Sequence, residues 1–196
     1  MLKYANSQVV FQEFPGETTL AFNITGCPNH CPGCHSPYLW KNEGTPLDTE
    51  VLSNTISMYK DTITCVGFMG GDQNPQEIKQ LSNWIKQNFP KLKTGWYSGR
   101  DFWSDDLMEG FNYVKFGSYK NELGGLDSPT TNQVMFKYIA CANRWLDITH
   151  YFQTKDIEFH NLINNFETDI NITIDELFDK QKSLIDLVFF KLFSKK

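Results

Sequence analysis

The sequence predicts an α/β fold built on a largely parallel sheet, because segments typical of strands and of helices alternate from residue 18 to about residue 117. Two observations carry this prediction. The predicted strands are apolar and rich in β-branched and aromatic residues, and the segments between them show helical periodicity. Strands are expected at 18–25, 62–69, 92–97 and 113–116, and helices at 49–60, 75–89 and 102–108.

Each element has its own local signal. The first strand is rich in Thr, Phe and Ile, and the second is nearly all apolar, as expected of a strand buried on both faces. Asp48 is placed to cap the first helix, and Pro90 ends the second. Two further strands are expected at 133–140 and 145–152.

The composition changes near residue 156. Residues 156–171 are acidic and rich in Asn, and 173–193 carry apolar residues at helical spacing, with Asp175 and Glu176 in the expected first turn. We therefore expect a domain over 1–155 and a C-terminal helical extension over 156–196, to which the sequence assigns no role.

Composition excludes several classes of protein. The chain has 196 residues, 40% of them hydrophobic, which is too apolar for a disordered chain. A formal net charge of −5 and a sequence pI near 5.3 disfavour a nucleic-acid partner. No apolar run approaches the roughly 18 residues of a membrane span, and the first residues lack an apolar signal core. We expect a cytoplasmic protein that contacts neither nucleic acid nor membrane.

Chemically distinctive residues follow three of the predicted strands. A cysteine-rich loop follows the first, Gly70-Gly71-Asp72 the second, and Ser98-Gly99 the third. Because the carboxyl ends of parallel strands meet at one edge of a sheet, where ligands bind, we expect all three motifs on one rim.

The cysteine loop has the spacing C-x3-C-x2-C, formed by Cys27, Cys31 and Cys34. Clustered thiols in a chain without an export signal indicate metal or redox chemistry more often than disulfides. Three thiolates can hold a cubane iron–sulfur cluster that keeps one iron open. Two alternatives remain: unliganded thiols, or a closed zinc site that needs a fourth ligand. The candidates for that ligand are His30, His35, Cys65, Cys141 and His150.

With Gly-Gly-Asp after the second strand, this spacing resembles that of the radical S-adenosylmethionine (SAM) enzymes, whose fold is a partial (β/α) barrel. The stretch from Gly26 to His35, Trp40 and Thr131-Asn132-Gln133 resemble the activating proteins of anaerobic (class III) ribonucleoside-triphosphate reductase. The resemblance covers about residues 1–155. Three positions depart from common patterns. Gly33 stands where the superfamily often has an aromatic residue, although the subfamily accepts Gly; His35 is often Tyr in that subfamily; and Asp72 is more commonly Glu in the superfamily.

The resemblance implies a cofactor and a site. Cys27, Cys31 and Cys34 would hold a [4Fe–4S] cluster, whose fourth iron the amino and carboxylate groups of SAM would chelate. Other residues implied to contact SAM are Gly33, Cys34 and His35 along the bound molecule, Gly70, Gly71 and Asp72 near its amino group, and, more weakly, Ser98 and Gly99 near its ribose or carboxylate. Asn132 and Gln133 could either pair a late strand or touch substrate.

The resemblance also implies partners. The substrate would be a glycine Cα–H on the reductase, and residues 117–131 would form a loop near the cleft that could receive it. A flavodoxin- or ferredoxin-like protein would donate the electron. Two rivals stay open: an activase of the pyruvate formate-lyase type, and a non-catalytic zinc-binding module.

Overall fold

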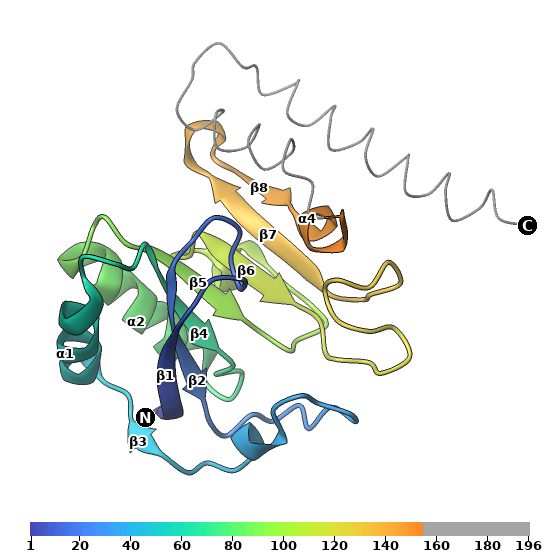
Figure 1. The fold of residues 1–196 in the computed structure, drawn as a ribbon, viewed down its shortest axis with the longest axis horizontal. Helices are drawn as coiled ribbons and strands as arrows, with labels where there is room; N and C mark the ends of the chain where they lie inside the picture. Colours follow the sequence, from blue (N-terminus) through green and yellow to red (C-terminus); the bar gives the residue numbers. More distant parts are fainter. Residues whose placement is uncertain (155–196) are drawn as a thin grey trace, which may run out of the picture.

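The computed structural model describes residues 1–154, in which eight strands form one mixed sheet in the order β3-β1-β2-β4-β5-β6-β7-β8 (Figure 1). The strands are β1 (Lys3–Val10), β2 (Thr19–Ile24), β3 (Thr45–Pro46), β4 (Cys65–Met69), β5 (Lys93–Tyr97), β6 (Tyr113–Phe116), β7 (Val134–Ile139) and β8 (Arg144–Asp147). The α-helices are α1 (Thr49–Tyr59), α2 (Pro75–Asn88), α3 (Asp105–Met108) and α4 (Thr149–Thr154). The predicted helix over 173–193 and extension over 156–196 lie outside the described residues.

The centre of the sheet confirms the predicted alternation. β2, β4, β5 and β6 are parallel neighbours, and α1, α2 and α3 lie between them along the chain. The predicted cap is present, since the side chain of Asp48 accepts a hydrogen bond from the backbone N–H of Val51 at 2.9 Å. β4 begins three residues later than expected, at Cys65, and α3 begins at Asp105 instead of residue 102.

The structure differs from the sequence prediction at β1 and at the end of β8. β1, which pairs antiparallel with β2, was not predicted, because its polar sequence KYANSQVV lacks an alternating apolar face. The strand expected over 145–152 ends at Asp147, and Thr149 begins α4 instead. Asp147 accepts a hydrogen bond from the Thr149 N–H at 2.8 Å, an Asx-type contact that turns the chain out of the sheet.

The flanks of the sheet are antiparallel. β7 pairs antiparallel with β6, and β8 with β7, while β1 and β3 extend the other side. Within residues 1–154 the sheet is open, with β3 and β8 at its edges. The fold class is therefore mixed α/β, and no closed barrel forms among these residues.

The two faces of the sheet carry separate cores. On one face, strand residues such as Phe22 and Val114 pack with helix residues such as Leu52 and Ile78. On the other, Phe14 lies in the segment between β1 and β2 and belongs to a smaller cluster. A side chain on Gly95 would overlap the Phe14 ring, so this glycine makes the space that the ring occupies.

A buried carboxylate anchors the amino ends of the parallel strands. Glu17 is 6% exposed and accepts hydrogen bonds from Lys93 Nζ at 2.7 Å, Tyr113 Oη at 2.8 Å and Thr64 Oγ1 at 2.7 Å. These donors begin β5 and β6 or directly precede β4. Glu17 thus ties the segment before β2 to three neighbouring strands.

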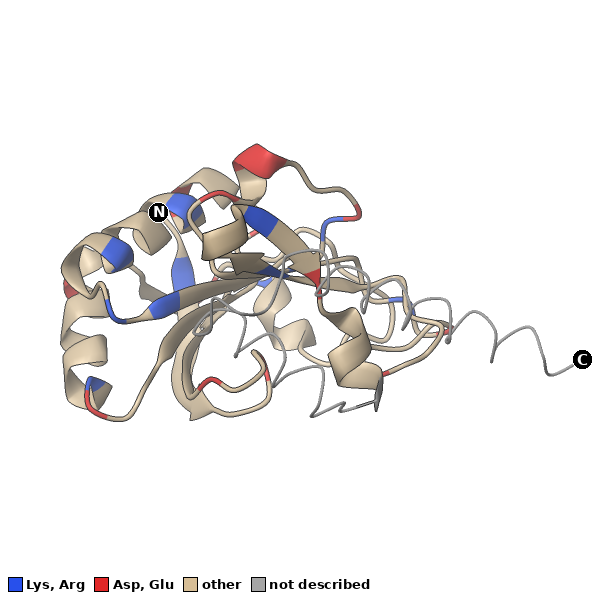
Figure 2. Cartoon of the chain, turned by 90° about the horizontal axis from the view of Figure 1, so that it is seen from above, with Lys and Arg blue, Asp and Glu red and all other residues tan. Residues whose placement is uncertain are grey.

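Across residues 1–154, no helix combines the length and apolar character that crossing a lipid bilayer requires. Figure 2 shows Lys and Arg interspersed with Asp and Glu along the described part of the chain.

Candidate functional site

The three motifs meet at the carboxyl edge of the parallel strands, around the side chain of Asp72. Asn29 of the cysteine loop donates to Asp72 Oδ2 at 2.6 Å, and the Gly99 N–H donates to the same oxygen at 2.8 Å. Ser98 Oγ donates to Oδ1 at 2.6 Å. The three loops therefore share one rim, as the sequence predicted.

The carboxylate of Asp72 already accepts hydrogen bonds from other residues of the protein. Its side chain is buried, both carboxylate oxygens accept protein hydrogen bonds, and Arg100 Nε lies 3.8 Å from Oδ1. The guanidinium of Arg100 also donates to the Asp72 carbonyl at 3.0 Å. Asp72 joins the loops of the rim, and its contact with a ligand ammonium group stays a prediction.

The base of the cysteine loop is held by backbone hydrogen bonds. The Gly26 N–H donates to the Lys41 carbonyl at 3.1 Å, and the Cys27 N–H donates to the Leu39 carbonyl at 3.0 Å. Within the loop, the Cys34 N–H donates to the Cys31 carbonyl at 3.1 Å, which closes the turn around the x2 spacing. The loop therefore leaves and returns to the sheet at fixed points.

The three thiols of the loop are free and partly buried. Burial raises the pKa of Cys27 and so do the charges of Asp72 and Cys31, while the backbone N–H groups of Asn29 and His30 lower it. In chemistry this donor set fits an iron–sulfur cluster, which takes thiolate ligands. In geometry, no group of three or more His, Cys, Asp and Glu side chains within residues 1–154 is arranged to hold a metal ion. The predicted ligand set stays a prediction.

The remaining cysteines lie elsewhere. Cys65 is completely buried in β4, where it packs as a small hydrophobic residue, as predicted. Cys141 is exposed in the short 3-10 helix η2 (Ala140–Ala142).

The two glycines before Asp72 have structural reasons of their own. Gly70 has φ +101° and Gly71 φ +100°, values that favour glycine. A Cβ on Gly71 would lie 2.5 Å from Ile78 Cδ1, so α2 requires a glycine there. The carbonyl of Gly70 accepts a hydrogen bond from Trp96 Nε1 at 2.8 Å. Their predicted approach to SAM is additional to these roles and is untested.

The segment over 117–131 reaches the cysteine loop, as the sequence suggested. A Cβ on Gly33 would lie 3.2 Å from Asn121 Oδ1 and 3.5 Å from Tyr119 Cε1. His35 is exposed, and its Nδ1 lies 3.5 Å from Ser36 Oγ. The side chains of Asn132 and Gln133 hold the start of this segment. Asn132 donates to the Ser118 carbonyl at 3.0 Å, and Gln133 donates to the Gly117 carbonyl at 3.3 Å.

Sequence reasoning missed two cations of the rim, Arg100 and Lys115. Lys115 is 7% exposed and donates from Nζ to the Gly117 carbonyl at 2.7 Å. The signals were present in the sequence. Arg100 directly follows Ser98-Gly99, and Lys115 is the one charged residue in the otherwise apolar strand β6.

Several polar atoms of the rim are buried without a hydrogen-bond partner among the described residues. They are Trp40 Nε1, Arg100 Nε and Asn132 Oδ1. Buried polar groups are normally satisfied by protein atoms or ordered water, and another exception, Thr19 Oγ1, begins β2 at the opposite end of the sheet. Trp40 also stacks on His30 of the cysteine loop, with ring centroids 5.0 Å apart.

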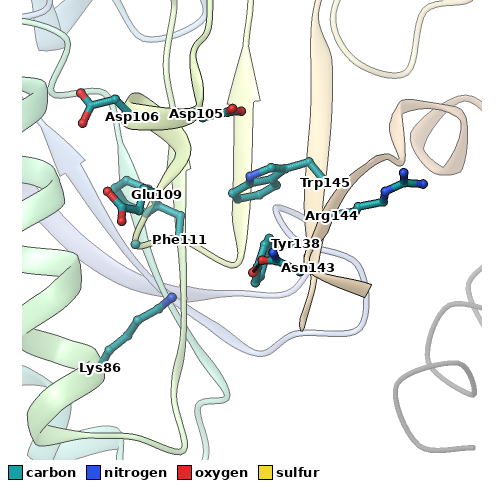
Figure 3. A pocket seen from close by; sticks show the side chains of 10 residues that line it. Lys86, Asp105, Asp106, Glu109, Phe111, Tyr138, Asn143, Arg144 and Trp145 are labelled. Carbon is teal, nitrogen blue, oxygen red and sulfur yellow. Dashed lines mark hydrogen bonds between the residues drawn. The ribbon is translucent and has the colours of Figure 1, made fainter. Parts of the chain in front are cut away.

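Two cavities lie near the sheet. One of about 680 Å³ is lined by Tyr97, Gln133 and Phe152 among others, on the same side as Phe14. The other, of about 800 Å³, lies between the α2–α3 region and the β7–β8 hairpin, with Phe111 and Trp145 in its wall (Figure 3). None of the predicted site residues lines the second cavity.

Comparison with known proteins identifies the family to which this chain belongs. Residues 15–115 match a family described as "4Fe-4S single cluster domain", a range that includes the cysteine loop, Asp72 and Lys115. The chain is also 30% identical over 125 residues to the anaerobic ribonucleoside-triphosphate reductase-activating protein of Enterobacteria phage T4. That match covers 58% of this chain and 78% of the phage protein. The chain therefore belongs to the 4Fe–4S family of anaerobic ribonucleoside-triphosphate reductase-activating proteins. No solved structure matches it significantly.

Proposed function

We propose that this protein is a radical SAM activase that generates a glycyl radical on anaerobic ribonucleoside-triphosphate reductase. The observation that carries the proposal is the meeting of three motifs at one rim: the cysteine loop, Gly-Gly-Asp and Ser-Gly are joined through the carboxylate of Asp72. The phage relative, named as a reductase-activating protein, supports the partner. We also propose that β2, β4, β5 and β6 with their helices form the partial barrel of the radical SAM type.

In this proposal Cys27, Cys31 and Cys34 bind a [4Fe–4S] cluster, and SAM binds against it. When bound, these cofactors supply the chemistry: one electron cleaves a C–S bond of SAM to give methionine and a 5′-deoxyadenosyl radical, which takes a hydrogen atom from a glycine Cα. The protein binds and orients the cofactors. Gly33, Cys34 and His35 would lie along SAM, Gly70, Gly71 and Asp72 near its amino group, and Ser98 near its ribose or carboxylate.

The loop over 117–131 is the proposed entrance for the glycine-bearing segment of the reductase. It contacts the cysteine loop at Gly33, and its later residues Leu126 and Asp127 line the 680 Å³ cavity beside the sheet. A protein substrate could therefore reach the rim from this side. A flavodoxin- or ferredoxin-like protein in the cytoplasm would supply the electron.

Electron paramagnetic resonance of the anaerobically reconstituted, dithionite-reduced protein tests this function. A reduced-cluster signal that changes shape when SAM is added is expected, because SAM would chelate the open iron. Cys31→Ala should lose both the signal and SAM cleavage while the sheet stays folded, with Cys141→Ala as the matched control. Zinc in the metal analysis and no signal would mean a structural site instead.

A further inference from the structure

Asn29, between the first two cysteines of the loop, forms hydrogen bonds through both its side chain and its backbone. Its side-chain Nδ2 donates to Asp72 Oδ2 at 2.6 Å, and its backbone N–H donates to the sulfur of Cys27. One residue therefore joins a predicted cluster ligand to the carboxylate at the centre of the rim. The sequence motifs assigned no role to Asn29, because Asp72 is 43 residues away along the chain.

The Ser98-Gly99 motif makes room for this contact. A Cβ on Gly99 would lie 2.4 Å from Asn29 Nδ2 and 3.4 Å from Asp72 Oδ2, so a side chain at position 99 would displace the Asn29 amide. The Gly99 N–H donates to the same carboxylate oxygen at 2.8 Å. The glycine of this motif therefore has a packing reason of its own, since it lets the cysteine loop reach Asp72.

Asp72 is a fixed acceptor for the Asn29 amide. Its residue is 4% exposed, and its other carboxylate oxygen accepts from Ser98 Oγ at 2.6 Å. Its backbone is held as well, because the guanidinium of Arg100 donates to the Asp72 carbonyl at 3.0 Å. The hydrogen bond between Asn29 and Asp72 therefore positions the loop residue on a rim that other contacts already hold.

The backbone on either side of Asn29 has few other anchors. Among residues 1–154, no hydrogen bond between two backbone groups involves residues 28–30. His30 has φ +45°, a conformation that is uncommon for a residue with a side chain, and its ring stacks on Trp40 with centroids 5.0 Å apart. The direction of the Asn29 N–H toward the Cys27 sulfur therefore depends on the contact that the Asn29 side chain makes with Asp72.

We propose that Asn29 is a positioning residue that couples the cluster to the rim: its side chain, held by Asp72, keeps its backbone N–H on the sulfur of Cys27. The inference rests on the proposed function, in which Cys27 binds the cluster and SAM binds beside Asp72. Hydrogen bonds to cluster sulfurs tune the reduction potential, and a donor favours the reduced state because reduction adds negative charge. A ligand that binds beside Asp72 therefore acts on the cluster through Asn29, and the cluster acts on ligand binding to the same extent.

The test compares wild type with Asn29→Ala, using Asn54→Ala as a matched control. Asn54 is exposed on α1, and its side chain forms no hydrogen bond within residues 1–154. Two quantities are measured on the anaerobically reconstituted proteins. One is the rate at which a chelator removes iron. The other is the reduction potential of the cluster in the molecules that retain it, with and without SAM.

A further variant exchanges the donor and the acceptor of the hydrogen bond. It combines Asn29→Asp with Asp72→Asn, which keeps the total charge and allows one hydrogen bond between the two positions. Each of the two substitutions is also made alone. The four proteins of this cycle, wild type included, show whether the two positions act together or independently.

Asn29→Ala should lose iron about tenfold faster than wild type, because the N–H on a cluster ligand is no longer held in place. The reduction potential without SAM should become more negative, and the shift that SAM causes should become smaller. The exchanged pair should retain iron better than either of its single variants, which independent effects would not give. Values equal to those of Asn54→Ala would overturn the proposal. Faster iron loss with an unchanged potential would also overturn it, because Asn29 would then only support the loop.

These outcomes are distinct from a failure of the proposed function. If wild type takes up no four-iron cluster, the activase proposal is wrong and the role of Asn29 is wrong with it. If wild type binds cluster and SAM while Asn29→Ala behaves as the control, only the role of Asn29 is wrong. Circular dichroism shows whether each variant folds. Should Asn29→Ala fail to fold, the exchanged pair decides: iron retention no better than that of its single variants would overturn the proposal.

Discussion

The two ends of the parallel strands each bury one acidic side chain, and the two are used differently. At the amino ends, Glu17 accepts from a lysine ammonium, a phenol and a threonine hydroxyl. At the carboxyl ends, Asp72 accepts from an amide, a hydroxyl and a backbone N–H of the rim loops. Glu17 thus joins strands, whereas Asp72 joins loops.

The lysines show the same contrast. Lys93 at the amino end has its carboxylate, while Lys115 at the carboxyl end has a carbonyl and no carboxylate within 4.0 Å among the described residues. At the amino end the buried carboxylate and a lysine form an ion pair, whereas at the carboxyl end Lys115 and Asp72 do not. The amino end should therefore control stability, and the carboxyl end should control cofactor binding.

The largest expected effect on stability concerns Phe14, which belongs to the smaller hydrophobic cluster on one face of the sheet. Phe14→Ala should lower the free energy of unfolding by about 3–5 kcal/mol, because the completely buried ring would leave a cavity over Gly95. Urea unfolding measures this. Phe11→Ala is the matched control, because Phe11 is 69% exposed and should change stability little. Equal effects of the two variants would contradict the packing described here.

Glu17→Ala tests the amino end of the comparison. Removing the carboxylate leaves Lys93 and Tyr113 without this acceptor, so we expect a loss of about 3 kcal/mol of unfolding free energy. Iron content per folded molecule after reconstitution should stay unchanged. Glu43→Ala, at an exposed position, is the control in the same unfolding experiment. A loss of iron in the folded Glu17→Ala protein would remove the distinction between the two ends.

Asp72→Asn tests the carboxyl end. The new amide N–H₂ would face donors on Asn29 or Gly99, so we expect a loss of about 2 kcal/mol of unfolding free energy. Unlike Glu17→Ala, it should also lower iron retention and SAM binding, because the rim loops lose their common acceptor. The exposed Asp61→Asn serves as control. Normal cofactor binding by Asp72→Asn would show that the loops hold their positions without it.

The smallest expected effect is the dependence of stability on pH that comes from Lys115, which unlike Lys93 has no carboxylate partner among the described residues. The pKa of Lys115 is about 8 in the folded protein, below its ordinary value of 10.5. Between these values the unfolded chain binds more protons, so Lys115 makes stability rise with pH by about 1 kcal/mol per pH unit. The raised thiol pKa values of Cys27 and Cys65 act in the opposite direction.

The difference between wild type and Lys115→Met isolates this contribution. In cofactor-free protein, the stability of wild type relative to Lys115→Met should rise as pH increases from 8 to 10. Thermal unfolding at several pH values measures it. A difference that does not vary with pH would mean that Lys115 keeps its ordinary pKa and is solvated.

The sequence predicted the local elements well where a pattern repeats within one segment. The buried strand β4 and the amphipathic helices α1 and α2 appear within a few residues of their expected positions, since periodicity and capping are properties of neighbouring residues. The prediction was wrong for β1, because its polar residues form a strand by pairing with β2. It was also wrong for 149–154, because an Asx contact at Asp147 ends the strand before them.

By itself the sequence determined that three cysteines share one short loop and that this loop, Gly-Gly-Asp and Ser-Gly each follow a strand of the same parallel series. The direction of the strands then places them on one rim. Only the tertiary structure decided that Asp72 binds Asn29, 43 residues away, and that Lys115 is buried there. These are contacts between separate segments, and they depend on how closely the loops approach one another, which the spacing within any one segment does not specify.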